Sequence, residues 1–342
     1  MKKTAPGPAP AEVLHELITG YQVTQAVHVA AALSIADLLA GGPQPSDALA
    51  EATGTHPGAL YRLLRALASV GVLEEEEDRR FRLTPVGDCL RSDAAEPLGD
   101  WAVYLGRASH WRAWTGLLDS VRTGRNAFLS VHGVHVNDYR IAHQEEGVIF
   151  DRAMTDQSRN AIRGILAGYD FGTFGTVVDI GGGEGALLAA LIAGYPKMHG
   201  ILFDQPHVAA GARRFLADAG ISDRCQVVAG SYFDAEAIPR GGDAYLLKNI
   251  LESWEDEVAV EVLRNCHQAM PAGAVLLVIE REIGRPNENR AGKFSDLNML
   301  VSPGGQNRTT EEFQAVFAAA GFTWREQIST AAGLDICQAS RD

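Results

Sequence analysis

The sequence has few cysteines, and no group of residues in it has the spacing of a metal site. Its four cysteines are widely separated and form no CxxC pair. They are Cys89, Cys225, Cys266 and Cys337. This usage favours free thiols in a reducing compartment over a disulfide framework. The histidines of residues 132–143 lack the spacing and the cysteine or carboxylate partners of a zinc site, so we expect no bound metal.

Long apolar runs and an excess of positive charge are also missing. No run approaches the ~18 apolar residues of a membrane span. The first residues, MKKTAPGPAPAE, follow two lysines with prolines and not with an apolar stretch, which excludes a signal peptide. We therefore expect a cytoplasmic protein with no membrane partner. The net charge of −13 argues against a nucleic-acid partner, because such binding depends on clustered lysine and arginine.

A chain of 342 residues is long enough for two domains. We place the boundary between 1–155 and 156–342. In the first part, apolar residues recur at helical spacing over 11–40, and residues 46–83 then follow the order helix, helix, hairpin. That order is typical of a winged helix. Because Glu74–Glu77 would repel phosphate, we expect this segment to serve packing or dimerisation.

The second part alternates short apolar strands with helices. Strands are expected at 176–180, 200–204, 225–230, 244–249 and 274–280, with a C-terminal pair around TWREQIS and LDICQAS. This alternation predicts a mostly parallel sheet covered on both faces, as in a doubly wound α/β domain.

A glycine turn follows the first of these strands. Gly181, Gly183 and Ala186 fit a loose dinucleotide-binding spacing, and Asp204 lies about twenty residues further on, where a ribose-binding acid belongs. Glycines let a cofactor approach the backbone, and the acid accepts hydrogen bonds from ribose hydroxyls. NAD-dependent enzymes share this pattern, so the glycine turn alone does not identify the cofactor.

Several motifs in order resemble one family over nearly the whole length. They are LYRLLRALASVGVLEE, FRLTPVGDCLRSD, DRAMTDQS, VVDIGGGEG, LFDQPHV, LLKNILESWEDE and LNMLVSPGGQNRTTEEFQAVFAAAGF. The chain resembles the small-molecule O-methyltransferases that use S-adenosylmethionine, in the bacterial natural-product branch related to plant caffeate-type enzymes. The resemblance implies a Rossmann-like methyltransferase domain, a helical N-terminal domain that forms a homodimer, and methylation of a small aromatic or polyketide-like natural product in antibiotic-type secondary metabolism.

The resemblance also assigns the cofactor residues. Gly181 and Gly183 lie in the methionine-binding loop and Asp204 holds the ribose. Ser231 and Tyr232 take the adenine side, although the family usually has an acid where this chain has Ser231. Two further residues complete the set, with Lys248 beside the sulfonium and Ser158 near the cofactor carboxylate.

Two of the three catalytic positions implied by the resemblance are changed. The position of the family's histidine holds Glu252, the first glutamate is present as Glu280, and the second has become Asn307. An ordinary glutamate, with a pKa of about 4.3, is a poor base for a phenol with a pKa near 10. If Glu252 lies near Glu280 in an apolar pocket, desolvation and repulsion raise one of the two pKa values. The alternative is that Glu252 faces solvent or a substrate amine and transfers no proton.

These changes leave several functions open. The chain is expected to be a methyltransferase for an acidic hydroxyl, or for a nitrogen or carbon nucleophile. A second hypothesis is an S-adenosylmethionine-binding enzyme that performs hydroxylation, decarboxylation, elimination or cyclisation. A third hypothesis, a ligand-sensing DNA-binding protein, is disfavoured by the acidic net charge. An NAD-dependent enzyme is the last alternative. Candidate pocket residues, each equally consistent with core packing, are Asp151, Met154, Trp254, Asp296, Asn298 and Met299.

Overall fold

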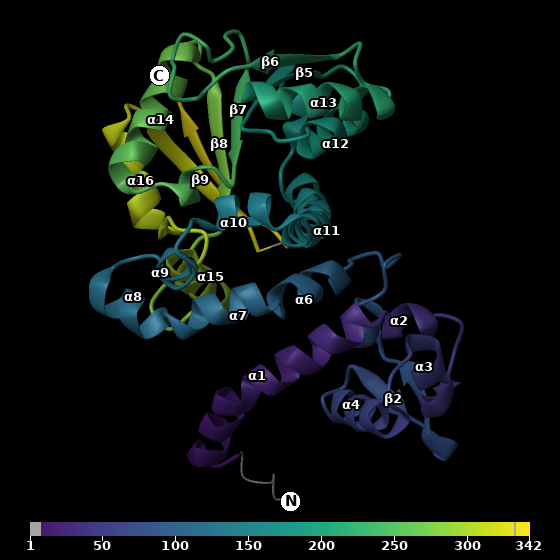
Figure 1. The fold of residues 1–342 in the computed structure, drawn as a ribbon. Coiled ribbons are helices and arrows are strands. Elements are labelled where there is room, and N and C mark those ends of the chain that lie inside the picture. Colours follow the sequence, from purple (N-terminus) through teal and green to yellow (C-terminus); the bar gives the residue numbers. More distant parts are fainter. Residues whose placement is uncertain (1–7, 332) are drawn as a thin grey trace, which may run out of the picture. The chain divides into compact units, whose positions relative to one another are not determined.

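The computed structural model describes residues 8–331 and 333–342, which divide into two compact units. The first unit comprises the chain up to residue 112 together with 140–157, and the second comprises 113–139 and 158–342. Figure 1 shows the elements of both, coloured along the sequence. Within the described ranges, no helix is both long and apolar enough to cross a membrane.

The first unit consists of helices and one small sheet. Its helices are α1 (Pro10–Ala32), α2 (Ile35–Leu38), α3 (Ser46–Thr53), α4 (Pro57–Ser69), α5 (Pro85–Asp88), α6 (Gly99–Leu105), most of α7 (Ala108–Thr115), and parts of α10 (Val136–Ala142) and α11 (Gln144–Gly168). Its strands are β1 (Gln44–Pro45), β2 (Leu73–Glu75) and β3 (Arg80–Leu83), in the order β1-β3-β2, with the short 3-10 helix η1 (Glu77–Arg79) between β2 and β3.

The core of this unit forms around the apolar stripe of α4. Leu60, Leu64 and Leu67 are buried, as residues spaced three and four apart on one helical face should be. They pack against Phe81 of β3. The expected hairpin is confirmed by the antiparallel pairing of Leu73 with Leu83, whereas the pairing of β1 with β3 was not anticipated.

The second unit is a seven-stranded sheet with helices on both faces. Its strands are β4 (Thr176–Ile180), β5 (His199–Asp204), β6 (Cys225–Ala229), β7 (Ala244–Lys248), β8 (Val275–Glu280), β9 (Thr323–Ser329) and β10 (Asp335–Ser340). The order is β6-β5-β4-β7-β8-β10-β9. Pairs among β4 to β8 are parallel, and β10 is antiparallel to both β8 and β9. The predicted doubly wound α/β class is confirmed, with an antiparallel pair at one edge.

Helices cover the two faces of this sheet. They are the end of α11, α12 (Ala186–Gly194), α13 (Pro206–Asp218), α14 (Asp256–Ala269) and α16 (Thr310–Ala319). Three further helices of this unit, α8 (Leu117–Thr123), α9 (Ala127–His132) and α15 (Arg290–Val301), pack against one another around a separate apolar cluster. Two short 3-10 helices, η2 (Phe171–Thr173) and η3 (Leu251–Ser253), follow α11 and β7. Figure 1 shows α12 and α13 on one face and α14 and α16 on the other.

The strand residues alternate between two hydrophobic cores. Val178 and Leu247 pack into the core with α14 and α16, whereas Val177 and Leu246 pack into the core with α12 and α13. Successive side chains of a strand point to opposite faces, so a strand buried on both sides needs an unbroken apolar run. This arrangement brings the carboxyl ends of β4, β5, β7 and β8 to one edge of the sheet, where ligands bind in such folds.

Candidate active site

The glycine turn after β4 leaves the backbone open to a ligand. Gly181, Gly183 and Gly185 have φ values of 67°, 61° and 93°, a region that favours glycine. A Cβ on Gly181 would lie 2.4 Å from the Cδ1 atom of Ile250. A Cβ on Gly183 would meet no atom of the described residues within 4 Å, so they leave space in front of Gly183. The turn therefore allows close approach of a cofactor at Gly183.

Asp204 ends β5 and is fixed against the same turn. Its Oδ2 atom accepts a hydrogen bond from the Gly183 backbone N–H at 2.9 Å, and its Oδ1 atom accepts one from Gln205 N–H at 2.6 Å. Each carboxylate oxygen can accept a further bond. The side chain is half-buried and lies beside the glycine turn. This arrangement suits a ligand with neighbouring hydroxyls.

Ser231 and Tyr232 follow β6 at the adjacent strand end. Ser231 is exposed, and its Oγ atom accepts the Phe233 backbone N–H at 3.3 Å. The Tyr232 ring lies against that of Phe233, with centroids 4.9 Å apart. Phe233 in turn contacts Trp254 edge-on at 5.3 Å and remains 41% exposed. Phe233 was not singled out from the sequence, although an aromatic directly after two expected cofactor residues was an available signal.

Asp179 and Lys248 are two ionisable residues at the carboxyl ends of β4 and β7, next to the glycine turn. Asp179 is 1% exposed, and its Oδ2 atom has no hydrogen-bond partner within the described ranges. Burial raises the pKa of Asp179 to about 7; the charge of Asp204 raises it further and that of Lys248 opposes the change. Burial lowers the pKa of Lys248, while Asp179 and Glu252 counteract this. Lys248 therefore lies close enough to Asp179 and Glu252 to feel the charge of both carboxyls.

Glu280 and Glu252 form a carboxyl pair at the ends of β8 and β7. Glu280 is 2% exposed. Its Oε1 atom accepts the backbone N–H groups of Leu251 at 2.5 Å and of Glu252 at 3.0 Å. Its Oε2 atom is buried and has no partner among the described residues. The side chain of Glu280 thus fixes the backbone that carries Glu252 through one of its carboxyl oxygens.

Burial dominates the electrostatics of this pair. It raises the pKa of Glu280 to about 8, with the charge of Glu252 adding to the effect and Arg308 opposing it. Burial also raises the pKa of Glu252, against the lowering effects of Lys248 and Arg281. Two neighbouring carboxyls of which one is buried and the other half-buried do not both ionise readily, so each raises the proton affinity of the pair.

Arg308, which sequence reasoning missed, clamps the segment that carries Glu252. It is 1% exposed and donates hydrogen bonds to the carbonyls of Leu251 at 2.9 Å and Trp254 at 2.7 Å. Its Nε atom lies 2.9 Å from the Asp256 carboxylate. A buried arginine in the GGQNRT segment gave no signal by itself, because its partners are backbone carbonyls some fifty residues away.

Asn307 and Asp296 meet beside the segment that carries Glu252. Asn307 is 3% exposed, and its backbone N–H donates to the Asp296 Oδ1 atom at 2.9 Å. The Oδ1 and Nδ2 atoms of Asn307 are buried and have no hydrogen-bond partner in the described part of the chain. The Gln306 N–H donates to the Glu252 carbonyl at 2.9 Å, which places the Asn307 loop on the η3 segment.

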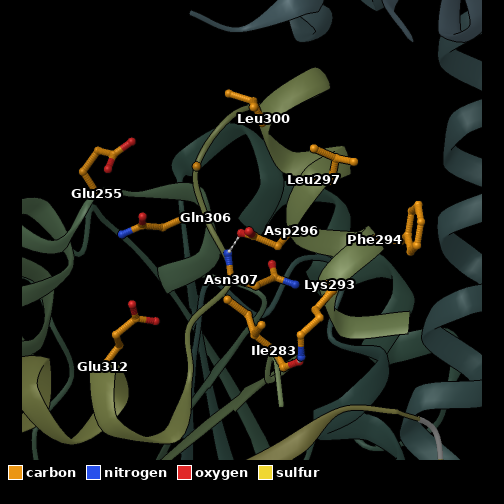
Figure 2. A pocket seen from close by; sticks show the side chains of 11 residues that line it. Glu255, Ile283, Lys293, Phe294, Asp296, Leu297, Leu300, Gln306, Asn307 and Glu312 are labelled. Atoms are coloured by element: carbon orange, nitrogen blue, oxygen red, sulfur yellow. Dashed lines mark hydrogen bonds between the residues drawn. The ribbon is translucent and has the colours of Figure 1, made fainter. Parts of the chain in front are cut away.

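A cavity of about 600 Å³ opens beside Asn307 and Asp296 (Figure 2). It is lined by Glu255, Ile283, Lys293, Phe294, Asp296, Leu297, Leu300, Gly305, Gln306, Asn307 and Glu312. The volume is within the range of small-molecule sites. Most of these lining residues were not predicted, because α15 and the loops around it meet only in the folded chain.

The remaining predicted residues occupy different places. Asn298 donates from Nδ2 to the Ser302 carbonyl at 3.1 Å, and Met299 is buried in α15; neither lines this cavity. Ser158 is a half-buried residue of α11 in the second unit. Two candidates lie on the part of α11 that belongs to the first unit, exposed Asp151 and half-buried Met154. Among the described residues, no cluster of three or more histidines, cysteines or carboxylates is arranged to hold a metal ion.

Comparison with known proteins identifies the family. A family model described as an O-methyltransferase domain matches residues 114–323, and one described as an O-methyltransferase dimerisation domain matches residues 15–93. The chain belongs to the O-methyltransferase family. The predicted family, its Rossmann-like fold and its cofactor S-adenosylmethionine are thereby confirmed.

The relatives of this O-methyltransferase include proteins whose names state different activities. The phenazine O-methyltransferase PhzM of Lysobacter antibioticus is 42% identical over 327 residues, which cover 96% of this chain and 95% of PhzM. The crystal structure of CalO1, a methyltransferase in calicheamicin biosynthesis with bound SAH, has a TM-score of 0.87 and 31% identity; the match covers 99% of this chain and 100% of CalO1. The aclacinomycin 10-hydroxylase RdmB of Streptomyces purpurascens is 36% identical over 315 residues, covering 91% and 84% of the two chains.

Proposed function

We propose that this O-methyltransferase methylates a small aromatic or polyketide-like acceptor of antibiotic-type metabolism, and that Glu252 accepts the acceptor's proton. The observation that carries this proposal is the Glu252–Glu280 pair, in which Glu280 holds the Glu252 backbone N–H at 3.0 Å and both pKa values are raised. The acceptor class follows from relatives such as the phenazine O-methyltransferase.

The residues at the strand ends fit S-adenosylmethionine. Open space at Gly183 admits the methionine part, and Asp204 offers acceptors for the ribose hydroxyls. Ser231 and Tyr232 are assigned to the adenine. Two polar residues complete the proposed set, Lys248 beside the sulfonium and Ser158 at the cofactor carboxylate. S-adenosylmethionine supplies an electrophilic methyl group, so the protein's task is to align the acceptor and accept its proton.

A glutamate with a raised pKa suits this task better than an ordinary one. General-base catalysis is most effective when the pKa of the base approaches the working pH. Burial moves the pKa of Glu252 in that direction. In its ionised form, Glu252 takes the proton that the acceptor loses as the acceptor atom bonds to the methyl carbon. Glu280 keeps the segment in place through its two backbone hydrogen bonds.

The first unit supports the proposal of a homodimer. Exposed apolar residues follow one another along α1, and this helix overlaps the region matched by the dimerisation model. They include Val13, Leu14, Leu17, Ile18 and Tyr21. We further propose that residues 46–83 form a winged helix used for packing, that the domains divide at 155/156, and that the protein is cytoplasmic without a nucleic-acid partner, in keeping with its charge of −13.

A non-methylating reaction is the second candidate. It is supported by the replacement of the expected histidine by Glu252 and by the relative named aclacinomycin 10-hydroxylase. In that case the cofactor would be retained while the acceptor changes its skeleton or oxidation state. The cationic sulfonium would then act electrostatically beside the bound acceptor.

Product mass after incubation with S-adenosylmethionine distinguishes the two candidates. Hydroxylated phenazines and naphthalenes serve as acceptors, and the reaction is repeated with S-adenosylhomocysteine. We expect the mass of one methyl group with the first cofactor and no product with the second. A product of altered oxidation state that forms with either cofactor would overturn methyl transfer.

The variant Glu252→Gln tests the proposed base. It should lower kcat by about 10²–10⁴-fold, the usual contribution of a general base, and leave S-adenosylmethionine affinity unchanged. The matched variant Glu257→Gln changes an exposed glutamate of α14 and should retain activity. Unchanged kcat in Glu252→Gln would show that Glu252 transfers no proton.

A further inference from the structure

The side-chain amide of Asn307 is buried and has no hydrogen-bond partner among the described residues. Both its polar atoms are buried without a partner in the described part of the chain, and the residue is 3% exposed. An unsatisfied buried donor or acceptor costs about 1–3 kcal/mol, so folded proteins retain few of them without a use. An amide with both atoms unpaired therefore points to a ligand that pairs with it.

Hydrogen bonds on either side fix the backbone from which the Asn307 side chain extends. The Asn307 N–H is bound to Asp296, and the N–H of the preceding Gln306 is bound to the Glu252 carbonyl. The following Arg308 makes hydrogen bonds to two carbonyls and a carboxylate. Three consecutive residues are thus fixed through their own contacts, and the amide of the middle one lies among the side chains that line the cavity (Figure 2).

The cavity offers apolar and acidic surroundings to this amide. Phe294, Leu297 and Leu300 of α15 provide an apolar wall suited to a flat ring. Glu255, Asp296 and Glu312 provide carboxylates, grouped in the same lining. These acidic groups oppose the entry of an anionic ligand.

The cation in the lining is already engaged. Lys293 is the sole basic residue among the described residues that line the cavity. Its ammonium donates to the backbone carbonyls of residues 283, 284, 285 and 288, at distances of 2.6 to 3.3 Å. Because an ammonium has three N–H donors, little of its hydrogen-bonding capacity is left for a ligand. A ligand carboxylate would therefore meet acids without a free counter-charge.

We propose that Asn307 recognises the methyl acceptor through a paired hydrogen bond, and that the acceptor is an uncharged aromatic compound carrying an N–H donor next to a carbonyl or hydroxyl oxygen. Aromatic carboxamides, lactams and amino-hydroxy arenes have this pattern. The Asn307 Oδ1 atom accepts the ligand N–H, and its Nδ2 atom donates to the ligand oxygen. This inference rests on the proposed function, because it concerns the acceptor of the same site.

Binding to the protein saturated with S-adenosylhomocysteine tests the inference without requiring methyl transfer. The probes are an ortho-hydroxynaphthamide, the corresponding hydroxynaphthoic acid and unsubstituted naphthol, titrated by calorimetry at neutral pH. We expect the amide to bind most tightly and the carboxylate most weakly. The variant Asn307→Leu should lose about tenfold to a hundredfold in amide affinity, the value of two hydrogen bonds, and keep its affinity for naphthol.

Gln226→Leu provides a matched control, since it removes the amide of an exposed β6 residue that is not one of the residues lining the cavity. It should preserve the preference for the amide over naphthol. Thermal unfolding without ligand supplies a second readout: Asn307→Leu should be at least as stable as the wild type, because no internal hydrogen bond is lost.

Three outcomes would overturn the inference: equal binding of the three probes, an equal loss of all three in Asn307→Leu, or destabilisation of that variant in the absence of ligand. Failure of the proposed function is seen separately. It would appear as absent S-adenosylhomocysteine binding, or as unmethylated products while the amide preference persists.

Discussion

The buried carboxyl of Glu280 makes folding stability depend on pH in a direction opposite to that of an ordinary acid. Its pKa rises from an ordinary value of 4.5 to about 8, chiefly through burial. An acid with a raised pKa in the folded state binds a proton that the unfolded chain releases. Its contribution is therefore complete below pH 4.5 and is lost as the pH rises towards 8.

The substitution Glu280→Gln isolates this effect. The Gln oxygen can still accept the Leu251 and Glu252 N–H groups, and its amide nitrogen replaces an oxygen that has no partner in the described structure. At about 1.4 kcal/mol per pH unit, the titration costs the wild type roughly 2–3 kcal/mol between about pH 5 and pH 7. The variant should gain that amount relative to the wild type over the same interval.

Urea unfolding at a series of pH values measures this difference, with Glu257→Gln as the exposed control. The free energy of unfolding of Glu280→Gln minus that of the wild type should increase steadily from pH 5 to pH 7. The control should follow the wild type throughout. Parallel curves for Glu280→Gln and the wild type would refute the reasoning, because they would require that folding does not change the proton affinity of Glu280.

Three further variants test the remaining parts of the site. Gly305→Ala should destabilise the protein by about 2 kcal/mol or more and impair acceptor binding. Gly305 has a φ of 85°, and a Cβ at this position would lie 2.0 Å from the Glu252 carbonyl oxygen. Chemical denaturation measures the loss of stability, and the KM for the acceptor measures the loss of binding. Asp204→Asn should weaken S-adenosylmethionine binding about tenfold or more with little change in melting temperature, as calorimetry would show; unaltered affinity would argue against its ribose role. Arg308→Met should cost about 3 kcal/mol of stability, because it leaves the Leu251 and Trp254 carbonyls unpaired; a melting temperature equal to that of the wild type would contradict the proposed clamp.

Local pattern was sufficient to predict the sheet. The strand β4 spans Thr176–Ile180 as expected, and β5 to β8 differ from their expected limits by one residue at an end. Runs of Val, Ile and Leu between glycine turns have few alternatives to a strand buried on both faces. Asp204 was predictable for the same reason, because the end of the second strand places it beside the glycine turn.

The region around Asn307 and Arg308 was less predictable because its contacts are long-range. Arg308 bonds to carbonyls near residues 251–254, and α15 lines the cavity with residues whose order alone suggests an ordinary helix. Asn307 was identified as a departure from the expected glutamate, but its unpaired amide is visible only in the folded chain. Similarly, the raised pKa of Glu280 depends on complete burial, which depends on packing of several elements.

The contacts around Glu252 have an evolutionary consequence. Glu280, Gln306 and Arg308 hold this segment through the N–H and carbonyl groups of its backbone. Because these hydrogen bonds do not involve the side chain at position 252, that residue can be exchanged while the frame around it persists. One substitution can therefore replace the reactive group without rebuilding its support. A lineage with such a frame can explore new reactions through single changes at little cost to folding.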